Sequence, residues 1–222
     1  MTFGALLEII VNNLRTKGMT KNRQFHKILK QNPWPKTYSK QDVFEHGWMS
    51  DENKENLTGL LRGIKNPLVI EIGTWLGMSA KFMLGIREDL HLITIDTFLG
   101  SKEIIENPEW KLILDSGLKE QAIRNLWDYR KRCCVIERPS QIALTSLSMN
   151  NIKPDLIYID GSHEYADVSI DLSYSLDFFD KAVVCGDDAN WPGVYRAVNE
   201  IEDSPGNQCI YTDGSFWEVI RW

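Results

Sequence analysis

Residues 68–80 read Leu-Val-Ile-Glu-Ile-Gly-Thr-Trp-Leu-Gly-Met-Ser-Ala, and this stretch decides the fold. Its apolar, β-branched opening predicts a buried parallel strand with Glu71 near its end. Gly73 and Gly77 then mark a turn, after which a helix is expected. Glycines at such a turn let a ligand approach the backbone closely, and open α/β folds bind small molecules at the carboxyl ends of their strands. The competing interpretation is an ordinary turn that happens to use glycine.

A second apolar run, His91–Ile95, ends in Asp96. In nucleotide-binding βαβ units, an acidic residue at the tip of the second strand accepts hydrogen bonds from ribose hydroxyls. A carboxylate suits this role because it only accepts hydrogen bonds and has two oxygens for a diol. Asp96 is therefore a candidate ribose ligand, and the competing interpretation is a solvated Asp at a strand end.

Strands and helices continue to alternate along the chain. Further strands are expected at residues 133–136, 155–160, 181–186, 208–212 and 215–220. The last two are separated by Asp213-Gly214, a pair typical of a tight hairpin turn. The pattern predicts an α/β fold with a doubly wound, mostly parallel, seven-stranded Rossmann-like sheet, helices on both faces and a C-terminal antiparallel hairpin. The segment from Thr97 to about Leu114 is interpreted as a long irregular loop at the ligand end and hence as a lid.

The first 47 residues are interpreted as an N-terminal helical extension, and residues 48–222 as the α/β domain. Apolar residues recur at helical spacing between Phe3 and Leu14. The extension could cover the sheet, a substrate or a second subunit, so a homodimer is one option. The N-terminal apolar run contains Glu8 and has neither preceding basic residues nor a cleavage site. We therefore expect no signal peptide, no membrane span and a cytoplasmic protein.

Composition narrows the function classes. The chain has 222 residues, 43% hydrophobic and 25% charged, which suits one α/β domain with a sizeable core. A formal net charge of -6 disfavours a general nucleic-acid or anionic-membrane binder, because such proteins are usually basic. Cys133, Cys134, Cys185 and Cys209 fall in or beside apolar runs without CxxC spacing, which predicts buried free thiols.

Three carboxylates follow the fourth and fifth predicted strands: Asp160, Asp187 and Asp188. Carboxylates that converge on one crevice repel one another unless something neutralises them. A divalent cation is one solution, and these hard oxygen ligands suit magnesium. Adjacent residues on a strand point to opposite faces, so Asp187 and Asp188 can share an ion only if the strand has already ended. The alternative is a structural Asp187 with one carboxyl group kept protonated.

His163 comes three residues after Asp160, at the expected start of a helix. A lone histidine is usually a surface residue or a satisfied core residue. Its place just beyond a strand tip makes it a candidate general base.

At this point the residues resemble a known family. Glu-Ile-Gly-Thr-Trp-Leu-Gly-Met-Ser at 71–79 looks like the first motif of class I S-adenosylmethionine-dependent methyltransferases. More narrowly, Ile-Asp-Gly-Ser-His-Glu-Tyr at 159–165, Gly-Asp-Asp at 186–188 and Trp-Pro-Gly-Val-Tyr-Arg-Ala-Val at 191–198 resemble the metal-dependent, macrocin-type sugar O-methyltransferases. The resemblance runs from about Trp48 to the C-terminus, which would make residues 48–222 an S-adenosylmethionine-binding catalytic domain.

The resemblance implies methyl transfer to a hydroxyl of a sugar or another polyol, with S-adenosylmethionine and Mg²⁺ as cofactors. It implies a magnesium held by Asp160, Asp187 and Asp188, and Asp160 or His163 as the base. The residues expected around S-adenosylmethionine are Glu71, Gly73, Thr74, Trp75, Gly77, Ser79, Asp96, Ser140 and Gln141, the last two near the adenine.

Two other functions compete. A nicotinamide-dependent oxidoreductase would normally show Gly-x-Gly-x-x-Gly at the first turn, and the terminal hairpin argues against it. A non-catalytic binding module on the same fold is the other option. The carboxylate cluster speaks against such a module, which has no need of charges that repel one another.

Overall fold

The computed structural model describes residues 20–38, 45–202, 205–212 and 214–222. The strands are β1 (Leu68–Ile72), β2 (His91–Asp96), β3 (Cys133–Glu137), β4 (Leu156–Ile159), β5 (Val183–Gly186), β6 (Asn207–Tyr211) and β7 (Trp217–Arg221). The helices are α2 (Lys21–Gln31), α3 (Asp51–Leu61), α4 (Met78–Ile86), α5 (Lys102–Glu106), α6 (Pro108–Asp115), α7 (Leu118–Leu126), the 3-10 helix η1 (Trp127–Tyr129), α8 (Ser140–Met149), α9 (Tyr165–Phe178) and α10 (Pro192–Glu202).

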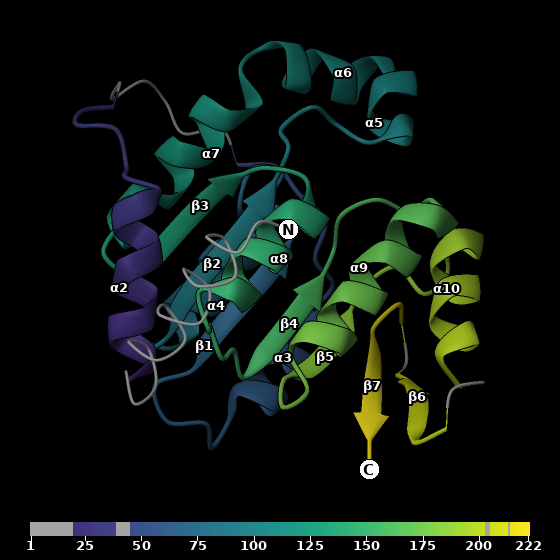
Figure 1. The fold of residues 1–222 in the computed structure, drawn as a ribbon. Helices are drawn as coiled ribbons and strands as arrows, with labels where there is room; N and C mark the ends of the chain where they lie inside the picture. The colour runs from purple at the N-terminus through teal and green to yellow at the C-terminus, as the bar shows by residue number, and fades with distance from the viewer. Residues whose placement is uncertain (1–19, 39–44, 203–204, 213) are drawn as a thin grey trace, which may run out of the picture.

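The described residues form one seven-stranded sheet in the order β3-β2-β1-β4-β5-β7-β6 (Figure 1). Strands β1 to β5 are parallel to one another, and β7 is antiparallel to both β5 and β6. The predicted fold class is confirmed, including the antiparallel pair at the C-terminus. Asp213 of the predicted hairpin turn lies outside the described residues.

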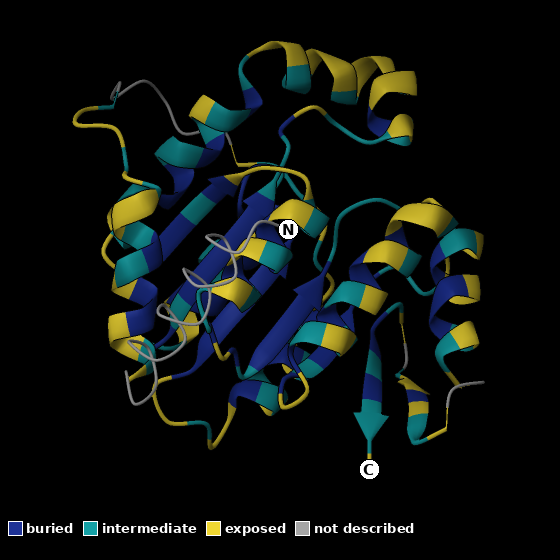
Figure 2. Cartoon of the chain, in the orientation of Figure 1, coloured by how far each residue is buried: buried dark blue, intermediate teal, exposed yellow. Residues whose placement is uncertain are grey.

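Helices cover both faces of the sheet because its central strands are apolar on both sides. Along β1, Leu68, Ile70 and Ile72 pack with α2, α8, α9 and α10, whereas Val69 packs with α3, α4 and α7. All five residues of β1 are buried, and Figure 2 shows the central strands in the buried colour. This is the continuous apolar run expected of a parallel strand between two helical layers.

The N-terminal helix predicted between Phe3 and Leu14 lies outside the described residues. Helix α2 begins after Thr20, whose hydroxyl accepts a hydrogen bond from the backbone N–H of Arg23. Among the described helices, none combines the length and the apolar character that crossing a bilayer requires. All four cysteines are free and buried, as predicted.

The segment from Thr97 to Leu114 is not irregular, so that part of the prediction is wrong. It contains α5 and α6. Asn107 caps α6 by accepting hydrogen bonds from the N–H groups of Glu109 and Trp110, and Pro108 occupies the first helical turn. Proline is favoured at that position because its missing N–H has no intrahelical partner there. Asn107-Pro108 is therefore a helix start inside the segment that the sequence analysis interprets as irregular.

The hairpin strand β7 fixes the end of β5. Trp217 is fully buried, and a Cβ added to Gly186 would lie 2.3 Å from its indole ring. The indole Nε1 donates a hydrogen bond of 2.8 Å to the backbone carbonyl of Asp187. The absence of a side chain at Gly186 thus lets Trp217 hold the chain where the carboxylate pair begins.

Candidate active site

A cavity of about 530 Å³ lies at the carboxyl ends of the parallel strands. Most of the residues predicted for the site line it: Gly73, Thr74, Trp75, Ser79, Asp96, Ser140, Gln141, Asp160, His163, Asp187 and Asp188. Glu71 and Gly77 are not among the lining residues. The topology therefore gathers residues that are more than 110 positions apart in the chain into one site.

The backbone of the chain passes so close to Gly73 that no side chain fits there. Its φ is +95°, and a Cβ built there would lie 2.0 Å from the backbone oxygen of Asp160. At Gly77, φ is +83°, and a Cβ would lie 3.0 Å from the side chain of Leu126. Packing within the chain is therefore one reason for glycine at both positions. Gly73 also lines the cavity, whereas Gly77 is not among the lining residues, and the close approach of a ligand to this turn stays a prediction.

Glu71 lies beneath the cavity, with its side chain completely buried. Ser79 Oγ donates a hydrogen bond of 2.7 Å to its Oε1, and Thr94 Oγ1 donates one of 2.6 Å to Oε2. Burial raises the pKa of Glu71 to about 7, although these two hydrogen bonds act in the opposite direction. Ser79 also lines the cavity, so it lies between Glu71 and the cavity.

Replacing Glu71 with glutamine is expected to make the unfolding free energy less dependent on pH. The folded-state pKa of about 7 exceeds the ordinary value of 4.5. Wild-type stability is therefore fully present below the lower value and is lost as the pH rises through the higher one. Between pH 4.5 and pH 8, Glu71→Gln should gain about 3 kcal/mol relative to wild type. Denaturant unfolding at both pH values measures this. Glu88→Gln, on an exposed residue, is the control, and an equal pH dependence in all three proteins would contradict the expectation.

Asp96 organises the loop that follows β1. Its Oδ2 accepts hydrogen bonds from the N–H groups of Thr74 (2.8 Å) and Trp75 (2.9 Å), and its Oδ1 accepts one from Phe98 (2.7 Å). A carboxylate has about four acceptor positions, so three are occupied by the protein and one remains on Oδ1. A ribose diol would have to share the occupied positions or use this remaining one.

Beyond β3, the cavity wall contains Ser140, the first residue of α8, and its neighbour Gln141. Ser140 Oγ donates a hydrogen bond to Oδ1 of Asp171, a buried, cavity-lining residue of α9 that was not predicted from the sequence. Burial raises the pKa of Asp171 to about 7. In the sequence, Asp171 appears only as one polar residue of an amphipathic helix, which is no signal for a site.

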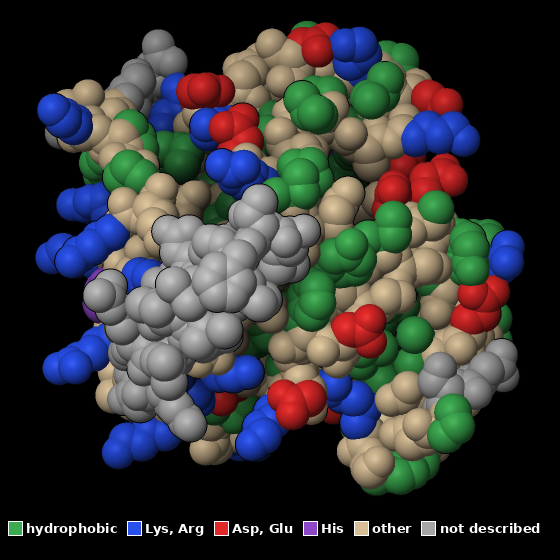
Figure 3. All heavy atoms as spheres, in the orientation of Figure 1, with side chains coloured by type: hydrophobic (Ala, Val, Ile, Leu, Met, Phe, Trp, Pro, Cys, Tyr) green, Lys and Arg blue, Asp and Glu red, His purple; other side chains and the backbone are tan. Residues whose placement is uncertain are grey.

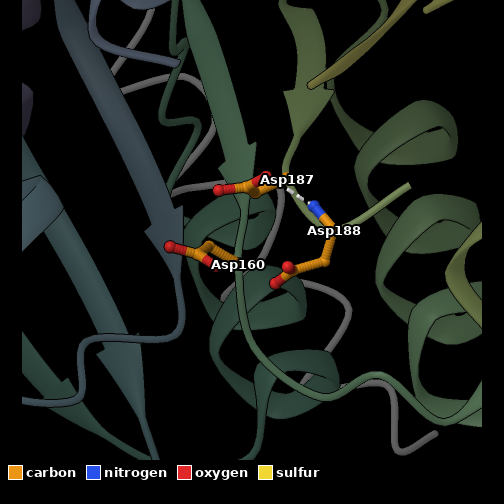
Figure 4. Close-up of side chains that lie close together, drawn as sticks. All are labelled: Asp160, Asp187 and Asp188. Carbon is orange, nitrogen blue, oxygen red and sulfur yellow. Dashed lines mark hydrogen bonds between the residues drawn. The ribbon is translucent and has the colours of Figure 1, made fainter. Parts of the chain in front are cut away.

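Asp160, Asp187 and Asp188 converge at the ends of β4 and β5 (Figure 4). One oxygen from each lies within 4.8 Å of the others. Strand β5 ends at Gly186, and Asp188 has a left-handed φ of +65°. The condition set by the sequence, that the strand end before the pair, is met. Burial and the carboxylates of Asp187 and Asp188 raise the pKa of Asp160 well above its usual range.

Asp187 accepts several hydrogen bonds from the protein, whereas Asp160 accepts none from the described residues. Asp187 accepts from Asn53 Nδ2, from Ser215 Oγ and from the backbone N–H of Asp188. None of the described residues donates a hydrogen bond to the carboxylate of Asp160. Asn53 and Ser215 are supporting residues that the sequence did not reveal, because one belongs to α3 and the other to the β6–β7 connection.

His163 lies between two carboxylates. Its Nε2 is 2.8 Å from Oδ2 of Asp188, and its Nδ1 is 2.9 Å from Oε1 of Glu103 on α5. Burial lowers the pKa of His163, but the contacts with Asp188 and Glu103 outweigh it and raise the pKa to about 10. The ring also stacks on Trp191, with centroids 4.4 Å apart and planes at 22°. Glu103 was not predicted, since it falls in the segment interpreted as irregular.

Three tryptophans from separate segments form another part of the wall: Trp48, Trp75 and Trp110. The ring centroids of Trp48 lie 4.9 Å from those of Trp110 and 6.0 Å from those of Trp75. Trp75 has a φ of +49°, which is rare for a bulky residue, and its Nε1 donates to Nδ1 of His46 at 3.2 Å. Such a wall suits a flat or ring-shaped ligand with an apolar face.

Acidic groups dominate the charge of the cavity. Among the described residues, one arginine, Arg138, lines it, against seven acidic side chains: Asp96, Glu103, Asp160, Asp167, Asp171, Asp187 and Asp188. Figure 3 also shows acidic side chains between α5 and the upper end of α9, whereas Lys and Arg gather along α2. The cavity therefore favours ligands or ions that carry positive charge.

Solved structures with this fold include several methyltransferases. A putative caffeoyl-CoA O-methyltransferase from Staphylococcus aureus is 15% identical, with a TM-score of 0.58 over 98% of this chain and 100% of that one. An O-methyltransferase from Bacillus cereus in complex with SAH is 16% identical, with a TM-score of 0.54 over 96% and 97%. CalS11, a TDP-rhamnose 3'-O-methyltransferase of calicheamicin biosynthesis, is 14% identical, with a TM-score of 0.51 over 91% and 93%.

At these identities the structural neighbours establish the fold alone. A search of curated proteins returned no match. The sequence itself matches the family described as a methyltransferase domain over residues 70–189, more than half of the chain. This range starts in β1 and ends just after the carboxylate pair, so it contains both the glycine turn and the acidic cluster. The chain belongs to this methyltransferase-domain family.

Proposed function

We propose that the protein is an S-adenosylmethionine-dependent O-methyltransferase that acts on a hydroxyl of a sugar or another polyol, with magnesium assisting deprotonation. The observation that carries the proposal is a single cavity that holds both the β1–α4 turn with Asp96 and the carboxylates Asp160, Asp187 and Asp188. Family membership and neighbours named as O-methyltransferases support it.

The chain offers groups for each part of S-adenosylmethionine. The hydrogen bond between Ser79 and Glu71 supports their assignment to the amino group of the methionine end, and the remaining acceptor position on Asp96 supports its assignment to the ribose. Ser140 and Gln141 lie one strand farther along the cavity wall, where the adenine would follow. The surplus of acidic side chains suits a cofactor that carries a positive sulfonium.

The donor set also fits magnesium. Asp160, Asp187 and Asp188 offer hard carboxylate oxygens, and Mg²⁺ is usually bound by one or two carboxylates plus water and substrate oxygens. None of the described residues donates a hydrogen bond to the Asp160 carboxylate, so a cation would supply the positively charged partner that this group lacks. When bound, such an ion would lower the pKa of an acceptor hydroxyl.

The protein's own contribution is to position the acceptor and to take its proton. Asp160 of the acidic cluster and the neighbouring His163 are the candidates for receiving the proton as the acceptor oxygen takes the methyl group from sulfur. Beyond the effect of burial, the carboxylates of the cluster raise the pKa of both groups, so a cation bound there would offset that charge and return either group toward its basic form. Two neighbouring hydroxyls on the acceptor would fix its orientation better than one, which favours a vicinal diol. Trp191 and the tryptophan wall provide flat surfaces against which a ring can lie.

Calorimetric titration with S-adenosylhomocysteine tests the cofactor assignment. Asp96→Ala should weaken binding by about 1–3 kcal/mol, because the hydroxyls lose an acceptor and the loop loses its organising carboxylate. Asp177→Ala, on an exposed residue of α9, should bind as wild type does. Equal affinity in all three proteins would remove Asp96 from the site, and binding of NAD in place of S-adenosylhomocysteine would favour the oxidoreductase alternative.

Turnover is then measured as release of S-adenosylhomocysteine with an acceptor panel of TDP-rhamnose, caffeoyl-CoA and simple vicinal diols. The first two are taken from the names of the structural neighbours.

A further inference from the structure

Glu103 and His163 come from distant segments and meet inside the cavity. Glu103 belongs to α5, after β2, and His163 belongs to the connection between β4 and α9. Both side chains are largely buried, with exposed fractions of 15% and 19%. Neither Oε1 of Glu103 nor Nδ1 of His163 has a regular hydrogen bond within the described residues, and the two atoms lie 2.9 Å apart. Oε1 of Glu103 and Nδ1 of His163 are therefore each other's polar contact, and the two side chains form an ion pair.

The same two segments make a second contact beside the first. Lys102 Nζ lies 3.5 Å from Oε1 of Glu164, between exposed side chains. Two consecutive residues of α5 thus meet two consecutive residues of the β4–α9 connection with opposite charges. The exposed pair contributes little on its own, but it repeats the same pairing of segments. The buried pair carries the argument, because removing either residue leaves one buried polar atom, Nδ1 of His163 or Oε1 of Glu103, without its nearest partner.

Other contacts hold the backbone of His163, one face of its imidazole ring and its Nε2 atom. Its backbone is fixed by α10, since a Cβ on Gly193 would lie 2.2 Å from the carbonyl oxygen of His163. Trp191 covers one face of the imidazole, and Asp188 meets Nε2. The remaining edge of the ring, with Nδ1, is the one that Glu103 holds.

We propose that Glu103 is the positioning residue for His163, and that through it the α5–α6 segment is tied to the acidic cluster. The proposal rests on the function proposed above for this site. Glu103 does not exchange a proton with the substrate. By holding the Nδ1 edge, it keeps Nε2 directed toward Asp188 and the place of the acceptor, as a carboxylate does for a histidine in other catalytic sites. Closure of α5–α6 over the cavity and orientation of His163 then become one event.

Three variants separate this role from a general effect on folding. Glu103→Gln keeps an oxygen that can accept a hydrogen bond from Nδ1–H but loses the charge, whereas Glu103→Ala loses both. Glu106→Ala, on the exposed side of the same helix, is the matched control. Long-range ¹H–¹⁵N spectra of the histidine side chains, with His163 assigned through His163→Gln, report on the imidazole directly. Trypsin cleavage after Lys111 reports on the α5–α6 segment without altering the residues at the cleaved bond.

In Glu103→Ala, we expect the His163 signals to shift and cleavage after Lys111 to become severalfold faster. Glu103→Gln should lie between Glu103→Ala and wild type, and Glu106→Ala should match wild type. Neither readout requires turnover, and S-adenosylhomocysteine binding is measured on the same samples, so failure of the proposed function would be seen separately. The proposal is overturned if either the His163 signals or the Lys111 cleavage rate of Glu103→Ala equals that of Glu106→Ala.

Discussion

Asp188→Asn is expected to lose Mg²⁺ binding and most methyl transfer to any active member of the acceptor panel, while keeping its affinity for S-adenosylhomocysteine. Asparagine is the informative replacement because Asp188 has a left-handed φ of +65°, which asparagine tolerates and alanine does not. The amide oxygen can still accept a hydrogen bond from His163, so the fold around the site is retained. Removing one of three charged ligands should raise the activation free energy of methyl transfer by several kcal/mol, which lowers turnover on the order of a thousandfold.

Calorimetric titration with Mg²⁺ and initial rates with and without chelator measure these effects. Asp167→Asn is the matched control, because Asp167 also lines the cavity but does not belong to the acidic cluster. It should keep both Mg²⁺ affinity and turnover. If chelator-treated wild type transfers methyl groups at full rate, the metal has no part in the reaction, and Asp187 and Asp188 are then structural residues.

Gly73→Ala is expected to destabilise the whole fold and not only the site. The new Cβ would lie 2.0 Å from the Asp160 oxygen and 2.5 Å from its carbonyl carbon, and both are backbone atoms that cannot rotate away. The positive φ of +95° adds strain, and overpacking of this kind costs about 1–3 kcal/mol by itself. Together we expect a loss of roughly 2–5 kcal/mol in the free energy of unfolding, measured by denaturant titration.

Gly59→Ala is the matched control for this substitution. Gly59 lies within α3, where a Cβ would have no heavy atom within 4 Å. Alanine there should stabilise the protein by about 0.5–1 kcal/mol, since it is the better helix former. A Gly73→Ala protein as stable as wild type would mean that β1 and β4 can separate without cost, against the close packing described above.

The strands and their tips could be predicted from the sequence because burial on both faces leaves a simple signal. The apolar runs before Glu71, Asp96 and Asp160 each gave a strand within a residue or two of its bounds. Right-handed crossovers then bring the ends of parallel strands to one edge, which is why Asp96 and Asp160 could be expected in one crevice. Local pattern and topology together were sufficient there.

The supporting residues could not be predicted, since their roles arise from contacts between remote segments. Asn53 and Ser215 reach Asp187 from α3 and from the hairpin, and nothing in their local sequence distinguishes them from surface residues. Gly73 illustrates a different limit: its positive φ could be guessed from the turn, but the backbone that passes beside it could not. Glu103 could not be singled out because it lies in the segment Thr97–Leu114, which the sequence analysis interprets as an irregular loop and which contains α5.

The acidic lining of the cavity has a consequence for the end of the proposed catalytic cycle. Among the described residues, seven acidic side chains line the cavity, against Arg138 and against His163, whose pKa is raised to about 10. A sulfonium becomes a neutral thioether when it gives up its methyl group, so the attraction that holds the substrate cofactor does not act on the spent one. The electrostatics of the cavity would thus favour exchange of used cofactor for fresh, and we expect product inhibition to be weaker than in a neutral cavity.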